Sequence, residues 1–245
     1  MNNYICGLHS INSVVTYEPE RIKTIFILKE KKDDKYQEIS HKLKSYGISV
    51  QSVTQRFFDQ KFSNVSHQGI AAEVKPKREL NEKDLDNIIA NNPNRCTLLA
   101  LDGVTDPHNL GACLRNADAA KVSAIIIPKD RSVSLNHTVS KIASGAAEVI
   151  PVIKVVNLSR VLNQLKEKNF WISGFDGDGT KNLYEHKFDS LNVLVMGAEG
   201  SGLRNSTKKN CDFLLKIPML GSVSSLNVSV ATGIALYEVV RQNKT

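Results

Sequence analysis

From residue 97 onward, short apolar runs alternate with stretches whose hydrophobic residues recur at helical spacing. Short apolar runs are typical of buried strands, and strands separated by helices pair in parallel with helices on both faces of the sheet. The alternation therefore predicts an α/β fold with a mostly parallel sheet. We expect its strands at residues 97–101, 124–127, 149–152, 171–175, 193–196 and 214–217.

The first part of the chain predicts a separate, smaller α/β module. Residues 24–28 and 48–50 have the composition of strands, and a charged segment at 35–46 has helical spacing between them. An apolar run at 70–74 predicts a closing strand. The following segment is polar, which divides the chain into a first domain (1–75), a linker (76–94) and a second domain (95–245). Asn81 with Asp84 predicts a capped short helix at the end of the linker.

Positive charge exceeds negative charge in this chain. It has 32 lysines and arginines against 25 aspartates and glutamates, a net charge of +7. Hydrophobic residues make up 41% and charged residues 23%, which excludes intrinsic disorder and collagen-like repeats. The charge favours a polyanionic partner such as a nucleic acid, although solubility alone would also account for it.

The cysteines and the apolar segments indicate the cellular compartment in which the protein is expected. The four cysteines form no C-x-x-C pair, so the spacing predicts neither a zinc site nor a disulfide framework. No run of about 18 apolar residues and no secretory signal is visible. We therefore expect a cytoplasmic protein with reduced thiols and no membrane partner. The cysteines are Cys6, Cys96, Cys113 and Cys211.

The first polar turn of interest follows the strand at 97–101 and leads into a helix expected from about Leu110. Asn109 is the expected N-cap of this helix, and Arg115 lies six residues further on, directed to the same edge. An alternative remains open, in which Asn109 only caps the helix and Arg115 pairs with Asp118 on the surface.

The second turn follows the strand at 193–196 and is rich in glycine. Gly197, Gly200 and Gly202 allow the backbone to approach a ligand closely. The spacing is not G-x-G-x-x-G, which argues against a nicotinamide dinucleotide. Such turns are often only turns, but Glu199 would be presented between the glycines without shielding by neighbouring side chains.

The third segment precedes the last helix and contains more small polar groups than a helix cap requires. An N-cap needs one such residue, and here there are four, so we expect a hydrogen-bonded ligand at this point. The four are Ser224, Ser225, Asn227 and Ser229.

Taken together, these segments closely resemble the SpoU, or TrmH-type, branch of the SPOUT superfamily of RNA methyltransferases. The matching segments, in family order, are Asn109-x-Gly111-x-x-x-Arg115, Gly197-x-Glu199-x-x-Gly202-Leu203, and Ile217-Pro218 with Ser225-Leu226-Asn227-Val228-Ser229. Three further segments extend the resemblance to RlmB-type 23S ribosomal RNA guanosine-2′-O-methyltransferases over nearly the whole chain. They are Cys6-Gly-Leu-His9, His67-Gln-Gly-Ile70 and Ser144-Gly-Ala-Ala-Glu148. Lys121 departs from the family, which usually has glycine there.

The resemblance implies a fold and a cofactor. The first domain would be a small ribosomal-protein-like α/β RNA-binding domain, and the second an α/β SPOUT methyltransferase domain with a deep trefoil knot, an exception to the rule that chains do not thread. S-adenosylmethionine would bind in the knot and leave as S-adenosylhomocysteine, with no metal. The residues implied to hold it are Met196, Gly197, Gly202, Ile217 and Leu226.

The resemblance also implies an activity in ribosomal RNA processing. A homodimer would methylate the ribose 2′-hydroxyl of one guanosine in 23S rRNA, free or in the assembling large ribosomal subunit. The implied catalytic residues are Asn109, Arg115, Glu199, Ser225 and Asn227. Because a guanidinium loses its proton reluctantly, we expect Arg115 to stay charged, to bind a phosphate and to stabilise the developing alkoxide. Two alternatives remain: a transfer-RNA ribose methyltransferase, and a non-catalytic rRNA-binding assembly factor.

Overall fold

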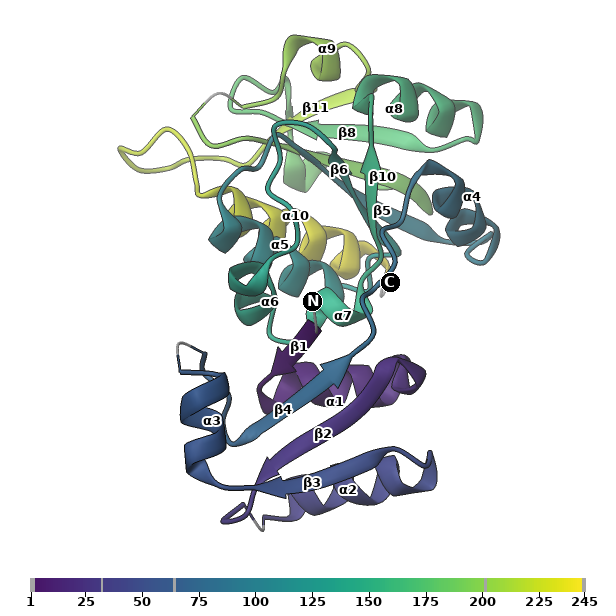
Figure 1. Cartoon of the computed structure of the whole chain (residues 1–245). Coiled ribbons are helices and arrows are strands. Elements are labelled where there is room, and N and C mark those ends of the chain that lie inside the picture. Colours follow the sequence, from purple (N-terminus) through teal and green to yellow (C-terminus); the bar gives the residue numbers. More distant parts are fainter. Residues whose placement is uncertain (1–2, 32, 64, 201, 244–245) are drawn as a thin grey trace. The chain divides into compact units, whose positions relative to one another are not determined.

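The computed structural model describes residues 3–31, 33–63, 65–200 and 202–243 of the 245-residue chain. The chain divides into two compact units (Figure 1). Unit 1 consists of Met1–Arg78 and Ser144–Val149, and unit 2 of Glu79–Ala143 and Ile150–Thr245.

Unit 1 is built on a four-stranded sheet with helices on both faces. The sheet order is β1 (Asn3–Cys6), β4 (Ile70–Val74), β2 (Ile22–Leu28) and β3 (Ser49–Val53). The buried side chains of α1 (Leu8–Tyr17) and α2 (Asp34–Ser45) pack together on one face, and those of α3 (Gln55–Lys61) pack on the other. The helix predicted at 35–46 and the strand predicted at 70–74 are confirmed. A 3-10 turn, η1 (Pro19–Arg21), joins α1 to β2.

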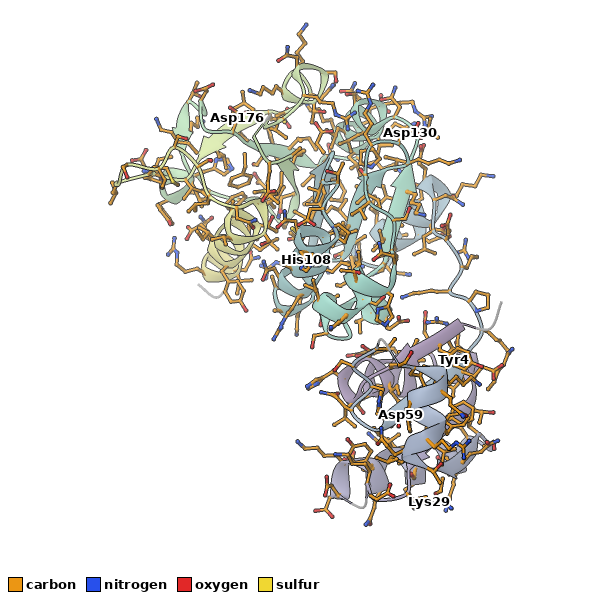
Figure 2. The ribbon with its side chains drawn as sticks, turned by 60° about the vertical axis from the view of Figure 1, so that its left-hand side comes forward. Tyr4, Lys29, Asp59, His108, Asp130 and Asp176 are labelled. Carbon is orange, nitrogen blue, oxygen red and sulfur yellow. The ribbon has the colours of Figure 1, made fainter. Side chains whose placement is uncertain are left out.

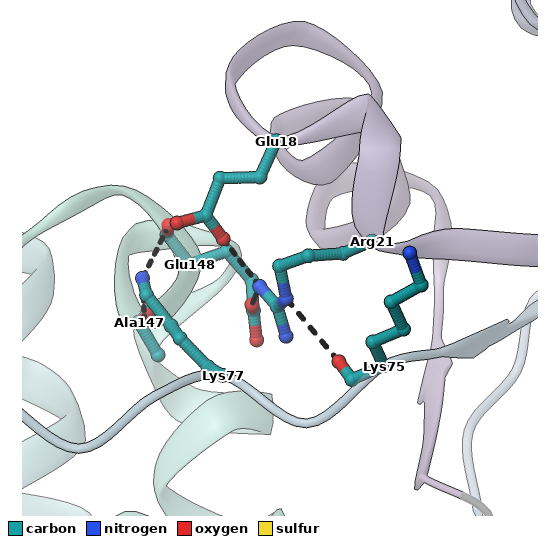
Figure 3. Close-up of polar contacts among 6 residues, drawn as sticks. All are labelled: Glu18, Arg21, Lys75, Lys77, Ala147 and Glu148. Carbon is teal, nitrogen blue, oxygen red and sulfur yellow. Dashed lines mark hydrogen bonds and ion pairs between the residues drawn. The ribbon is translucent and has the colours of Figure 1, made fainter.

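A short segment from the middle of the chain completes unit 1 (Figure 3). It carries α7 (Ala146–Val149), whose Glu148 carboxylate accepts a hydrogen bond from Arg21 Nη1 at 2.9 Å. Arg21 also pairs with Glu18 at 2.5 Å, and Lys77 Nζ donates to the carbonyl oxygen of Glu148 at 2.6 Å. Burial opposes the charge of Arg21, but the hydrogen bonds that it donates to the carboxylates of Glu148 and Glu18 hold its pKa above the ordinary value.

Replacing Glu148 with alanine is expected to lower the free energy of unfolding of unit 1 by about 1–2 kcal/mol, because it leaves the half-buried Arg21 with one carboxylate in place of two. Urea denaturation measures this change. Glu38→Ala is the control, because Glu38 pairs with Lys42 on an exposed helix face and such pairs contribute little. Equal stabilities of the two variants would contradict a structural role for the Glu148 contact.

Unit 2 contains a seven-stranded sheet whose six strand pairs, within the described residues, are all parallel. The mostly parallel α/β fold predicted from the sequence is therefore confirmed. In sheet order the strands are β7 (Val152–Val155), β6 (Ala124–Pro128), β5 (Cys96–Asp102), β10 (Leu191–Gly197), β8 (Trp171–Phe175), β11 (Phe213–Lys216) and β9 (Lys181–Asn182).

Helices cover both faces of this sheet (Figure 1). One face buries α4 (Glu82–Ala90) and α8 (Leu158–Glu167) against alternate residues of the central strands. On the other face, α5 (Pro107–Ala119) packs against α10 (Val228–Asn243) and α6 (His137–Ala143). The shorter elements are η2 (Leu183–Glu185) and α9 (Asn205–Lys208).

One predicted strand was misplaced. The strand expected at 149–152 lies at Val152–Val155, because residues 146–149 form α7. Apolar residues run through both elements, so the local pattern does not separate them. The cap predicted at Asn81 is confirmed, because its side chain accepts from the N–H of Lys83 and its own N–H donates to Asp84. The domain limits 1–75, 76–94 and 95–245 stay a prediction, as does the trefoil knot, which strand order does not establish by itself.

Each cysteine of the chain is a free thiol. Burial raises the pKa of Cys113 to about 11, and the side chain is fully buried on α5. None of the helices in the described part of the chain combines the length and apolar character needed to span a bilayer.

A thiol reagent such as DTNB is expected to modify Cys113 at least about a hundredfold more slowly than a free cysteine at pH 8. With a pKa of about 11, only about one thiol in a thousand is ionised there, and the thiolate is the reacting form. The rate should rise about tenfold per pH unit, since the ionised fraction does. Mass spectrometry of the labelled peptide measures it, and urea-unfolded protein is the control. Rapid labelling of native Cys113 would contradict the prediction.

Candidate active site

The carboxyl ends of β5, β10, β8 and β11 meet at one edge of the unit 2 sheet. Gly197 is paired with Asp102 across β10 and β5, and Met196 with Phe175 across β10 and β8. The turns that follow these strands therefore converge, although they are far apart in the sequence. In Figure 2, Asp176 marks the turn after β8.

A pocket of about 970 Å³ opens at this edge. Its walls come from the turns after β8 and β10 and from the segment between β11 and α10. All five residues predicted to hold a cofactor line it: Met196, Gly197, Gly202, Ile217 and Leu226. Glu199, Ser225 and Asn227 line it as well.

The glycine turn after β10 brings bare backbone to the pocket. The N–H of Ala198 donates to Gly202 O at 3.1 Å, and the N–H of Gly202 donates to Ala198 O at 3.0 Å, which folds the turn tightly. A Cβ atom on Gly197 would lie 2.2 Å from the carbonyl carbon of Gly202. Only glycine fits at Gly197, and Gly202 has a φ of +63°, in the region that favours glycine.

Three of the predicted catalytic residues form one hydrogen-bonded cluster. Asn227 Nδ2 donates to Asn109 Oδ1 at 2.9 Å and to Glu199 Oε1 at 2.5 Å. Asn227 Oδ1 accepts from the backbone N–H of Ser229 at 2.9 Å, so the same side chain caps α10. The helix cap and the polar cluster thus share one residue, which fixes the position of the amide beside the pocket.

The structure corrects the prediction that Asn109 is the N-cap of α5. The helix begins at Pro107, and Asp106 caps it by accepting from the N–H groups of His108 and Asn109. Proline suits the first helical position because it needs no hydrogen-bond donor there. Asn109 is therefore inside the first turn and 7% exposed, with its side chain bonded to Asn227.

Arg115 and Ser225 stand apart from this cluster. Arg115 is exposed on α5, does not line the pocket, and has no hydrogen bond or ion pair with any described residue. The alternative ion pair with Asp118 is therefore not formed. Ser225 is exposed at the pocket wall, on the segment that leads to α10.

The sequence reasoning missed an ion pair in the pocket wall. Lys208 Nζ lies 2.7 Å from Asp176 Oδ2, and both residues line the pocket. Burial alone would raise the pKa of Asp176, but the hydrogen bond and charge of Lys208 and the N–H of Asp178 bring it below the ordinary value. The sequence feature that could have indicated this pair is a carboxylate directly after a buried strand, Asp176 after the strand at 171–175. Among the described residues, no group of three or more potential metal ligands is found.

Two family models match the chain. Residues 97–237 match the SpoU rRNA Methylase family, and residues 4–80 match the RNA 2′-O ribose methyltransferase substrate binding family. The chain is 52% identical over 241 residues to the 23S rRNA (guanosine-2′-O-)-methyltransferase RlmB of Vibrio parahaemolyticus, covering 98% of this chain and 97% of the relative. It is 50% identical to RlmB of Escherichia coli K12, covering 99% of each.

A solved structure has the same fold. The SpoU methyltransferase AviRb from Streptomyces viridochromogenes, determined in complex with AdoMet, aligns with a TM-score of 0.79. It covers 100% of this chain and 91% of AviRb at 23% identity. Both parts of the sequence thus match family models, and relatives about half identical match over nearly the full length. The chain belongs to the SpoU rRNA methylase family.

Proposed function

We propose that this protein transfers a methyl group from S-adenosylmethionine to the ribose 2′-hydroxyl of a guanosine in 23S rRNA. The observation that carries the proposal is the identity of 50–52% over nearly full length to relatives named as 23S rRNA (guanosine-2′-O-)-methyltransferases. The cluster around Asn227, built beside a pocket, supports the catalytic part of the proposal.

The pocket suits S-adenosylmethionine. Its volume lies in the range of ligand sites, and it combines apolar walls with bare backbone. Met196, Ile217 and Leu226 would contact the adenosine part, and the backbone at Gly197 and Gly202 would form hydrogen bonds. When bound, the cofactor supplies a methyl group made electrophilic by its sulfonium. A solved relative in complex with AdoMet supports this assignment.

The residues of the chain would align the ribose and promote loss of its hydroxyl proton to water as the oxygen–methyl bond forms and the sulfur–methyl bond breaks. Arg115 stays charged, binds a phosphate beside the target ribose and stabilises the negative charge that develops on the 2′-oxygen. The absence of any partner for Arg115 among the described residues is consistent with a partner on the RNA. Asn109, Glu199, Ser225 and Asn227 position the ribose and the cofactor.

The first domain, residues 1–75, would bind the RNA substrate, and the knotted second domain, residues 95–245, would carry out the transfer. A match of residues 4–80 to a substrate-binding family supports the first assignment. We further propose a cytoplasmic homodimer. Apolar side chains exposed on α10 and on the loop before it suit a contact with a second copy. They are Leu220, Val223, Val230 and Tyr237.

Methyl transfer from labelled S-adenosylmethionine to protein-free 23S rRNA and to transfer RNA tests the proposal. Resistance to alkaline cleavage maps the methylated ribose. Label at one guanosine of 23S rRNA is expected. Label only in transfer RNA would show that the substrate is transfer RNA and not 23S rRNA. No label in either RNA or in assembling ribosomal particles, despite cofactor binding, would favour the non-catalytic assembly factor.

Asn227→Asp is expected to lower the turnover number about tenfold, with the melting temperature nearly unchanged. The carboxylate still accepts the N–H of Ser229 and caps α10, but it donates nothing to Asn109 or Glu199 and adds a like charge. Single-turnover methyl transfer and thermal unfolding measure the two effects. Ser229→Ala, which removes only the hydroxyl bond to Asn227, is the control. Unchanged turnover in Asn227→Asp would remove Asn227 from the catalytic set.

A further inference from the structure

Arg204 is held by a carboxylate that is completely buried. Asp102, at the end of β5, has a side-chain exposure of 0%, whereas that of Arg204 is 42%. Asp102 accepts two hydrogen bonds from this one residue, from the backbone N–H at 3.1 Å and from Nε at 2.7 Å, and Nη2 lies 2.5 Å from the same carboxylate in an ion pair. The arginine is thus fixed through its backbone and through one side of its guanidinium.

This pair lies at the same edge of the sheet as the pocket. Asp102 is the register partner of Gly197, and the tight turn from Ala198 to Gly202 connects Gly197 to Arg204. Glu199 is near one end of that turn, and Arg204 comes two residues after the other end. Arg204 Nη2 lies 3.9 Å from the position that a Cβ atom on Gly103 would take, which places the guanidinium against the turn after β5.

The guanidinium retains unused donors. Of its five N–H groups, those on Nη1 have no hydrogen-bond partner among the described residues. A planar guanidinium with free N–H donors can bind two oxygens of a phosphate. Because this side chain is already held in place, it loses little conformational entropy on binding. The backbone carbonyl oxygen of Arg131, an exposed residue, also lies beside Gly103, 3.8 Å from the position that the Cβ atom would take.

We propose that Arg204, oriented by Asp102, binds a backbone phosphate of the RNA strand that enters the pocket. The inference rests on the proposed function, because it takes RNA as the substrate. A purely structural arginine, present only to neutralise Asp102, would account for the ion pair but not for the partial exposure of the side chain or for the N–H groups on Nη1, which have no partner among the described residues. In the proposed role, Arg204 positions the RNA and does not contact the reacting atoms.

The double variant Asp102→Asn/Arg204→Gln separates the two roles. Amide groups can hydrogen-bond to each other without leaving a buried charge unpaired, and the net charge of the protein does not change. The matched control is Glu82→Gln/Arg160→Gln, which removes an arginine–carboxylate pair between α4 and α8, where Arg160 Nη2 contacts Glu82 at 2.6 and 2.8 Å.

Fluorescence anisotropy with transcribed fragments of 23S rRNA measures RNA affinity across salt concentrations. For the Asp102/Arg204 double variant we expect a dissociation constant about tenfold higher and a salt slope smaller by about one. Calorimetric binding of S-adenosylmethionine and the melting temperature should match those of the control variant. RNA affinity and salt slope equal to wild type would overturn the inference. Failure of the wild-type protein to bind or methylate the RNA would instead overturn the proposed function.

Discussion

Replacing Arg115 with alanine is expected to lower the turnover number for methyl transfer to RNA by about a hundredfold to a thousandfold, the usual cost of losing one donor that stabilises a developing oxyanion. The side chain is exposed on α5 and has no partner among the described residues, so its loss should not disturb the fold. The melting temperature and the affinity for S-adenosylmethionine should therefore stay at wild-type values. Single-turnover kinetics with saturating RNA measure the chemical step.

Arg115→Lys distinguishes charge from shape. Lysine keeps the positive charge but lacks the planar fork that grips a phosphate through two bonds, so we expect only part of the activity to return. Arg95→Ala is the matched control, because Arg95 is also exposed and stands at the opposite, amino end of β5. Near-wild-type turnover in Arg115→Lys would argue against bidentate binding of a phosphate. Equal losses of turnover in the Arg95→Ala and Arg115→Ala variants would show that Arg115 contributes only the general electrostatic attraction of RNA.

Replacing Gly197 with alanine is expected to weaken S-adenosylmethionine binding by about a hundredfold or more. The added methyl group would lie 2.2 Å from the carbonyl carbon of Gly202, so the backbone of the turn must move. Gly197 and Gly202 both line the pocket, and a displaced turn misplaces its hydrogen-bonding groups. Isothermal titration with S-adenosylhomocysteine measures the affinity in the absence of turnover.

Gly221→Ala is the matched control for this variant. Gly221 lies in the segment between β11 and α10, and a Cβ atom there would meet nothing within 4 Å. We expect wild-type affinity for the control and a melting temperature lowered only in Gly197→Ala, since overpacking against backbone is destabilising. Wild-type affinity of Gly197→Ala for S-adenosylhomocysteine would contradict this prediction, because it would show that the turn accommodates the added methyl group.

Much of the fold could be predicted because its signals are local. The strand at Trp171–Phe175 is confirmed without change, and four other predicted strands of unit 2 lie within two residues of the predicted limits. The two-residue strand β9 was not predicted. Apolar runs of strand length are visible in the sequence itself. The failure at 149–152 is also local, because α7 and β7 are both short and apolar and only packing distinguishes them. The family motifs likewise include residues whose role is packing, such as Gly111, where a Cβ atom would lie 2.8 Å from Ile142.

The sequence by itself determined the α/β class, the polar turns after the strands and most residues of the candidate site, because hydrophobic periodicity and turn composition depend on near neighbours. Only the tertiary structure decided which of those residues meet. Asn227 contacts Asn109 across 118 positions because α10 packs on α5. Asp102 and Arg204 meet across 102 positions because β5 and β10 are neighbours in the sheet and Arg204 follows the turn after β10. Strand order follows from how the whole set of apolar faces is buried together, and no local pattern encodes it.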